Sequence, residues 1–127
     1  RNAIRPQDAG EPLVSDVVVS FPFGSAMLTA AARASIDAAA SGDGIRRIDI
    51  RGRTDNVGPA AANDLLARQR AAAVAQYLRA RHPHLAGAEV KVDGRGVCCY
   101  ATENDTPEGR ARNRRVEIAF ERVPSDL

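Results

Sequence analysis

The sequence has few of the features that mark metal proteins or disulfide-stabilised domains. Its two cysteines, Cys98 and Cys99, are adjacent. Two neighbouring thiols without a second cluster of ligands do not form a zinc site of the usual spacing, and a framework of structural disulfides is also absent. Neighbouring cysteines can close a small ring, bridge to another chain or stay reduced, so they leave the redox compartment open. We expect no metal and no cofactor.

Long apolar runs are also missing. No stretch reaches the length of about 18 apolar residues that could span a bilayer. The N-terminus lacks the basic segment followed by an apolar one that marks a secretory signal. Any targeting or anchoring segment is therefore expected to have been removed or to lie outside this chain, in a membrane-anchored parent protein.

Lysine is nearly absent, because Lys91 is the only lysine among 18 basic residues. The positive charge is thus almost entirely guanidinium, which can bind carboxylates or phosphates through two parallel hydrogen bonds. A genome-wide bias in amino-acid composition would give the same pattern. The formal net charge is only +2, so overall charge neither favours nor excludes a polyanionic partner.

Signals for catalysis and for nucleic-acid binding are weak as well. No serine or cysteine lies in a recognisable nucleophile elbow, and no pair of carboxylates divides clearly into acid and base. The arginine-rich run at 110–115 contains no aromatic residue and adjoins Glu117, which favours a solvated turn with one or two site-facing arginines over a nucleic-acid surface. The sequence therefore predicts neither an enzyme nor a nucleic-acid-binding protein.

What is present predicts one domain. A chain of 127 residues with 44% hydrophobic content can build one modest core. Residues 1–12 are polar, contain two prolines and show no periodicity, so we expect a disordered linker there. Residues 13–123 are predicted to form the domain and residues 124–127 a tail.

Hydrophobic periodicity predicts strands that alternate with helices. Period-two or β-branched runs predict strands, and alanine-rich segments predict helices. The predicted strands are Val14–Phe23, Ile45–Thr54, Val90–Val92 and Val116–Phe120, and the predicted helices are Ala30–Ala40 and Asn63–Arg81, with a short helical turn begun by Thr106-Pro107. This alternation indicates an α/β or α+β sandwich, in which helices cover one sheet.

The longer predicted helix carries an arginine where an apolar residue is expected. At about 100° per residue, Arg70 and Asn63 fall in the same sector as an apolar stripe formed by Leu66, Ala73, Val74, Tyr77 and Leu78. Arg70 therefore faces the sheet and needs a partner or a cleft. Because helical side chains lean toward the N-terminus of their helix, Arg70 points to the turn after Thr54, where Asp55 is the expected counter-charge.

Two interpretations of Asp55 and Arg70 remain open from the pattern alone. The first is a buried ion pair that joins strand to helix. The second is a cleft in which the carboxylate receives an ammonium group and the guanidinium receives a carboxylate, so that the pair recognises a zwitterionic amino-acid head. The free backbone N–H groups at the start of the helix would favour an anion at the same place.

Several ordered motifs together resemble a known family. The first half carries Gly52–Gly58, Asn63, Leu66–Ala71 and Val74, the second half carries Gly94–Gly96, Asn104, Thr106 and Glu108–Ile118, and Phe21–Ser25 precedes both. This pattern closely resembles the OmpA-like domain, found in proteins of the OmpA, Pal and MotB types, over roughly Val17 to Phe120.

The resemblance implies both a fold and a function. The fold would be a two-layer sandwich with a mixed four-stranded sheet and flanking helices, in the order βαβαβ(α)β. The function would be non-covalent binding of peptidoglycan through the meso-diaminopimelate of its stem peptide, which would anchor a larger envelope protein to the cell wall from the periplasm.

The resemblance also implies which residues bind the ligand. Asp55 and Arg70 would hold the amino and carboxylate ends of diaminopimelate. Asn63, Phe23 and Arg114 stand at positions that would line the same pocket. Thr54 is a further candidate, whose alternative role is to support the turn after the strand.

Three departures from the family pattern suggest an alternative function. Arg53 stands where histidine or tyrosine is common, and on a strand it shares a side with Asp55, so it could pair with Asp55 and compete with the ligand ammonium. Tyr100 replaces a frequent proline, and Cys98-Cys99 replaces polar or acidic sequence. The alternative is an OmpA-like protein-interaction or oligomerisation domain that has lost peptidoglycan binding.

Overall fold

The computed structural model describes residues 16–122, so the predicted linker at 1–12 and tail at 124–127 lie outside the described residues. In chain order the elements are β1 (Val17–Ser20), α1 (Ala30–Ala40), β2 (Ile45–Gly52), α2 (Ala60–Arg81), the 3-10 helix η2 (Pro83–Leu85), β3 (Glu89–Gly94), α3 (Pro107–Asn113) and β4 (Arg115–Arg122). The predicted alternation of strands and helices is confirmed. Within residues 16–122, no helix combines the length and the apolarity needed to cross a membrane.

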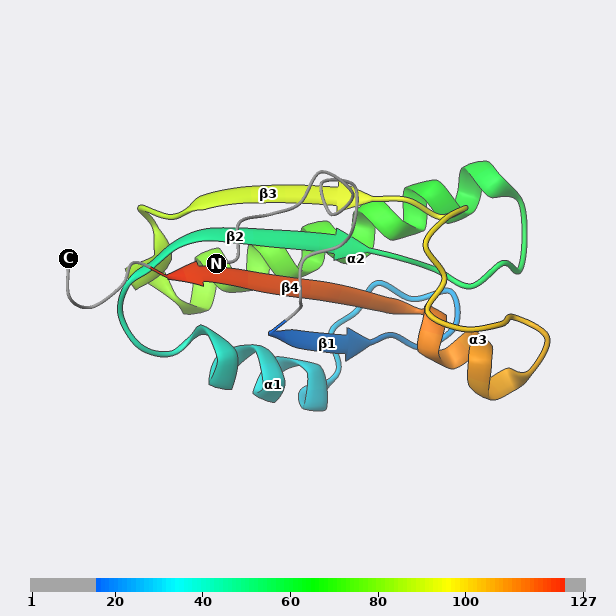
Figure 1. The fold of residues 1–127 in the computed structure, drawn as a ribbon, viewed down its shortest axis with the longest axis horizontal. Coiled ribbons are helices and arrows are strands. Elements are labelled where there is room, and N and C mark those ends of the chain that lie inside the picture. Colours follow the sequence, from blue (N-terminus) through cyan, green and yellow to red (C-terminus); the bar gives the residue numbers. More distant parts are fainter. Residues whose placement is uncertain (1–15, 123–127) are drawn as a thin grey trace, which may run out of the picture.

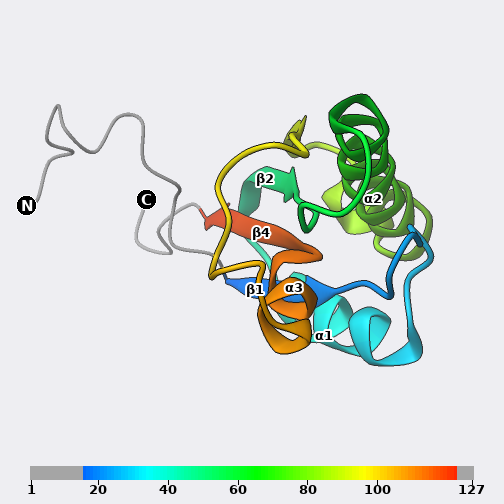
Figure 2. The same cartoon turned by 90° about the vertical axis from the view of Figure 1, so that its right-hand side faces the viewer.

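The four strands form one mixed sheet in the order β1-β4-β2-β3. The last strand, β4, lies between β1 and β2 and runs antiparallel to both, whereas β2 and β3 are parallel. Figures 1 and 2 show α1 and α2 on the same face of this sheet, with α3 beyond the ends of the strands. The predicted two-layer architecture with a mixed four-stranded sheet is thus confirmed.

The core lies between the sheet and the two longer helices. Alternation along the strands places one apolar set toward the helices, as the period of two requires. The fully or almost fully buried members include Val19, Ile36, Ile48, Ile50, Val74, Leu78, Val116 and Ile118. β2 is shorter than predicted, because it ends at Gly52 and not at Thr54. Beyond Gly52 the chain makes one more bond across to β4, from Arg53 N to Arg115 O at 2.8 Å, and then turns.

Glycines let α2 lie very close to the ends of β2 and β3. A Cβ atom placed on Gly52 would lie 2.0 Å from the carbonyl oxygen of Ala67, and one on Gly94 would lie 2.5 Å from the backbone of Arg68. Glycine is the residue that permits such an approach of two backbones. This contact sets the N-terminal half of α2 against the strand ends, and Arg70 follows within the next turn of the helix.

Candidate functional site

The predicted site residues gather where β2 ends. Asp55 lies in the turn that leads from β2 to α2, and Arg70 reaches toward it from α2. The turn at Phe21–Ser25 follows β1, and Arg114 lies between α3 and β4. Because β1 and β2 both neighbour β4, these segments meet at one end of the sheet, although they are far apart in sequence.

Arg70 is the largest fully buried side chain among residues 16–122, with 0% exposed. Its guanidinium donates to three backbone carbonyl oxygens: Nε to Ser25 at 2.8 Å, and the two terminal nitrogens to Arg53 and to Pro22 at 3.1 Å each. The guanidinium carbon also lies 5.3 Å from the centre of the Phe21 ring. The prediction that Arg70 faces the sheet is confirmed, and the residue joins the turn after β1 to the end of β2.

The direct ion pair of Arg70 and Asp55, one of the two interpretations left open by the sequence, is not formed among the described residues. In the described part of the chain, the ion pair of Asp55 is with Arg114, at 3.3 Å, and the other carboxylate oxygen of Asp55 accepts from the backbone N–H of Val57 at 3.0 Å. Burial lowers the pKa of Arg70 to about 10, and the negative charge of Asp55 partly offsets this effect. Asp55 therefore stabilises the charge of Arg70 electrostatically without direct contact, and the hydrogen bonds of Arg70 go to backbone carbonyl oxygens.

Arg114 ties the site to the rest of the sheet. Its Nε donates to the carbonyl oxygen of Phe21 at 3.1 Å, and the backbone N–H of Phe21 donates back to Arg114 O at 2.9 Å. The side chain of Arg114 is 19% exposed, against 5% for that of Asp55. Of the two arginines beside Asp55, Arg114 is thus the one that solvent reaches.

Asn63 and Thr54 support the turn after β2. The side-chain amide of Asn63 donates to Val57 O at 3.1 Å and so closes the turn onto the first helical turn of α2. The hydroxyl of Thr54 lies 2.7 Å from Asp55 O and 2.9 Å from Gly96 O, and the residue is 1% exposed. The structure thus gives both side chains a local supporting contact.

Phe23 is the most exposed of the predicted site residues, at 66%. It lies in a tight turn in which Ser25 N donates to Pro22 O at 3.1 Å and Gly24 has a φ of 68°. The same turn supplies two of the three carbonyl oxygens that hold Arg70. Phe23 therefore lies exposed in the turn whose carbonyl oxygens hold Arg70.

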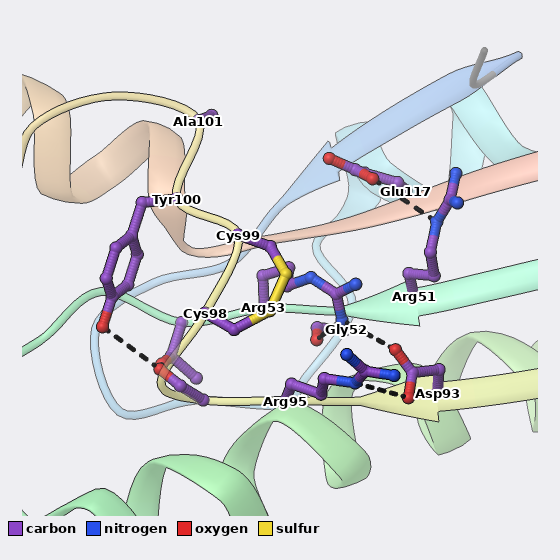
Figure 3. Close-up of a disulfide and its surroundings, with 12 residues drawn as sticks. Arg51, Gly52, Arg53, Asp93, Arg95, Cys98, Cys99, Tyr100, Ala101 and Glu117 are labelled. Carbon is purple, nitrogen blue, oxygen red and sulfur yellow. Dashed lines mark hydrogen bonds and ion pairs between the residues drawn. A yellow bond between two sulfur atoms is a disulfide. The ribbon is translucent and has the colours of Figure 1, made fainter. Parts of the chain in front are cut away.

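Arg53 points away from Asp55. Its guanidinium donates to Asp93 on β3 at 3.1 Å and to Gly52 O at 2.8 Å, and the side chain is almost entirely buried. Burial lowers the pKa of Arg53, and the charge and hydrogen bond of Asp93 oppose that shift. The pairing of Arg53 with Asp55, which the sequence left possible, is replaced in this structure by the pairing with Asp93 of β3, on the same face of the sheet (Figure 3).

Two residues with supporting roles were not predicted. Asn113 is 0% exposed, and its amide oxygen accepts from Ala101 N at 2.7 Å and from Thr102 N at 3.1 Å. Arg115 donates to Cys99 O at 2.7 Å and pairs with Glu117 at 2.8 Å. Both hold the segment between β3 and α3. The only signal for them in the sequence was their place in the run at 108–118, which resembles the family pattern. Without the family pattern, this polar run resembles a solvated turn.

A cavity lies away from this site, and the described residues offer no metal site. A cavity of about 270 Å³ lies between α2, η2 and β3, lined mainly by apolar side chains and bordered by Arg79 and His82. Its lining includes Ile48, in the middle of β2, and none of the predicted site residues. Residues 16–122 contain no group of three His, Cys, Asp or Glu side chains that could hold a metal ion.

Comparison of the chain with known sequences finds a family match and several relatives. A model of the OmpA family matches residues 20–114. Peptidoglycan-binding protein ArfA of Mycobacterium tuberculosis is 49% identical over 72 residues, which cover 57% of this chain and 22% of that protein. Outer membrane protein A of Bordetella avium is 34% identical over 125 residues, covering 91% of this chain and 62% of that protein. The chain thus spans less than two thirds of these relatives.

Solved structures share the fold. The cell wall anchor of the T6SS from Pseudomonas aeruginosa superposes with a TM-score of 0.64 at 26% identity, over 84% of this chain and 80% of that chain. The C-terminal domain of Helicobacter pylori MotB has a TM-score of 0.69 at 22% identity, with 87% of each chain covered. The second likeness supports the fold alone.

Proposed function

The chain belongs to the OmpA family, a family of binding modules and not of enzymes, and on that premise we propose that it binds peptidoglycan without covalent chemistry. Relatives include a protein named as peptidoglycan-binding and a structure described as a cell wall anchor. The proposed role is to anchor a larger, membrane-associated envelope protein to the cell wall from the periplasm.

The observation that carries the proposal is one carboxylate beside two guanidinium groups at the end of β2. Asp55 pairs with Arg114, and the charge of Arg70 lies close enough to interact with both. Such a site offers one position for an ammonium group and one for a carboxylate. The side-chain end of meso-diaminopimelate carries both groups on one carbon, so we propose that residue of the stem peptide as the ligand.

Each predicted residue has a proposed part in binding. Asp55 receives the ammonium group. Arg70 and Arg114 attract the carboxylate, together with the backbone N–H groups that begin α2, whose N-cap residue Pro59 provides no side-chain cap. Phe23 covers the aliphatic part of the ligand at the rim. Asn63 and Thr54 hold the turn in shape.

The burial of Arg70 determines how it can reach a ligand. A guanidinium has five N–H groups, and three of those of Arg70 are bonded to carbonyl oxygens. Because the side chain is 0% exposed, the other two can meet a ligand carboxylate only if neighbouring chain, such as the turn at Pro22–Ser25, moves aside. We therefore propose that Arg114 meets the carboxylate first and that Arg70 contributes its charge, with direct contact after a shift of this turn.

Titration calorimetry with muropeptides tests the proposed ligand. We expect a diaminopimelate-containing muropeptide to bind, and the lysine-containing equivalent, which lacks the terminal carboxylate, to bind at least about ten-fold more weakly, because loss of one charge-assisted contact costs about 1.5–3 kcal/mol. Asp55→Asn should abolish binding, whereas Asp43→Asn, in the exposed turn at the other end of β2, should leave it unchanged. Equal affinity for the two muropeptides would contradict the diaminopimelate site.

The alternative of a domain that has lost its ligand predicts no retention on purified sacculi. It was motivated by the Cys98-Cys99 segment and by the possibility that Arg53 pairs with Asp55, and Arg53 instead pairs with Asp93. Retention of the wild-type domain on sacculi, together with release of Asp55→Asn, would exclude this alternative.

A further inference from the structure

An exposed apolar surface lies in the segment that joins β3 to α3. Val97 is 58% exposed and Tyr100 is 37% exposed. Between them Cys98 and Cys99 form a disulfide, and Cys99 is also exposed. We call these four residues, Val97–Tyr100, the disulfide turn. Figure 3 shows the ring of Tyr100 on one side of this stretch of chain and the sulfur atoms on the other, toward Arg53.

Contacts on both sides hold the disulfide turn in place. Before it, Gly96 N donates to the carboxylate of Asp64 at 2.7 Å. After its second cysteine, Arg115 donates to Cys99 O at 2.7 Å, and the Tyr100 hydroxyl lies 3.4 Å from Gly96 O. An apolar surface that is ordered in advance loses little conformational entropy when a ligand packs on it. The turn therefore has the rigidity of a contact surface.

The disulfide turn begins beside the candidate site. The carbonyl oxygen of Gly96, which precedes the turn, lies 2.9 Å from the hydroxyl of Thr54, and Asp55 is the next residue. In Figure 2 the yellow-to-orange segment after β3 borders the end of β2 on one side, and the blue turn after β1 lies on the other. A ligand held at Asp55 would thus have the disulfide turn as a neighbour.

We infer that the disulfide turn is a second subsite, which packs against a sugar ring of the glycan strand to which the stem peptide is joined. This inference rests on the proposed function. A pyranose ring presents an apolar face of C–H groups and a rim of hydroxyls. Tyr100 and Val97 offer apolar surface, and Arg95, with its side chain 64% exposed, offers donors nearby.

The size of the surface favours a sugar over a protein partner. A stable protein interface covers about 800 Å² on each partner, far more than four residues of one turn can offer. One aromatic ring with a few apolar and polar neighbours is enough to pack on a single sugar ring, whose apolar face is of similar size. The occupant that the adjoining site would bring to this place is the glycan.

Two probes with the same diaminopimelate-containing stem peptide test the inference by calorimetry, one free and one joined to its disaccharide. We expect the wild type to bind the disaccharide-peptide about five-fold more tightly, the equivalent of about 1 kcal/mol of apolar contact. Tyr100→Ala combined with Val97→Ser should remove this gain and leave the affinity for the free peptide unchanged. Tyr100→Phe, which retains the ring, should keep the gain, as should Val92→Ala, a matched exposed valine on β3.

The outcomes separate the two proposals. If the wild type binds both probes equally and Asp55→Asn binds neither, the sugar subsite is wrong and the proposed function stands. A gain that survives in the Tyr100→Ala, Val97→Ser double variant would likewise overturn the subsite. If the wild type binds neither probe, the proposed function fails and the subsite fails with it.

Discussion

The guanidinium of Arg70 donates to the backbone carbonyl oxygen of Arg53 at 3.1 Å, while the side chain of Arg53 reaches across the sheet to Asp93. Arg53 thus has two structural roles. Its carbonyl oxygen holds the buried cation of the candidate site, and its own charge is neutralised on β3. This arrangement separates the two arginines that the sequence places near Asp55.

Replacement of Arg70 tests its structural part. We expect Arg70→Ala to lower the free energy of unfolding by about 3 kcal/mol or more, because three carbonyl oxygens lose their donor and a cavity opens in the core. Arg70→Lys should recover only part of this loss, since one ammonium group cannot match the fork of the guanidinium. Urea denaturation measures both variants. A change below about 1 kcal/mol for Arg70→Ala would show that the three contacts are not structurally important.

The role of Arg53 gives a prediction about binding. Because Arg53 pairs with Asp93 and not with Asp55, we expect Arg53→Gln to change the affinity for a diaminopimelate-containing muropeptide by less than about two-fold, well under 1 kcal/mol. Calorimetry on variants with matched thermal stability is the measurement. A large rise in affinity would mean that Arg53 does compete with the ligand for Asp55.

The close approach of α2 to β2 predicts a contrast between two glycines. Gly52→Ala should destabilise the domain by about 2–3 kcal/mol, because the new Cβ would lie 2.0 Å from the backbone of Ala67. At Gly87 a Cβ would meet nothing within 4 Å, so Gly87→Ala should stay within about 0.5 kcal/mol of the wild type. Thermal unfolding of both variants under one set of conditions provides the test, and equal stabilities would contradict the packing.

A cluster at the other end of the molecule predicts a dependence on pH. His82 and Tyr77 each bond to Asp37, at 2.7 and 2.9 Å, and these hydrogen bonds, that of His82 first, lower the pKa of Asp37 below its ordinary 3.8. A carboxyl whose pKa is lower when folded stabilises the fold above its unfolded pKa, and this stabilisation disappears as the pH falls through the folded value.

The stability difference between wild type and Asp37→Ala should therefore be fully present well above pH 3.8 and should shrink as the pH falls below that value. Urea titrations at a series of pH values give the difference directly. A constant difference for Asp37→Ala across the range would assign its effect to packing alone.

Asn113 is expected to control the order of the segment before α3. Asn113→Ala removes the acceptor of two backbone N–H groups and the donor to Thr102 O at 3.0 Å. We expect faster hydrogen exchange at the amides of Ala101 and Thr102 and a loss of about 2 kcal/mol in stability. The exposed Asn56→Ala serves as the control. Unchanged exchange at both amides would show that the segment is held by other contacts.

The sequence alone determined the elements and the unusual position of Arg70. The period of two in Ile48 and Ile50 and the 3.6-residue period of α2 depend on neighbours along the chain, so they can be read without the fold. The same periodicity placed an arginine in the apolar stripe, and a guanidinium that faces a sheet must have partners there. Ordered motifs then identified the family.

Only the tertiary structure decided which partners these charges take. The carbonyl oxygens of Pro22 and Ser25 carry no signal in the sequence, because every residue has a carbonyl oxygen, and the choice of Arg114 for Asp55 depends on β4 lying between β1 and β2. The pairing of Arg53 with Asp93 likewise requires β3 beside β2 in parallel register. Charge pairs between distant segments follow from how the strands are ordered, and local periodicity does not contain that order.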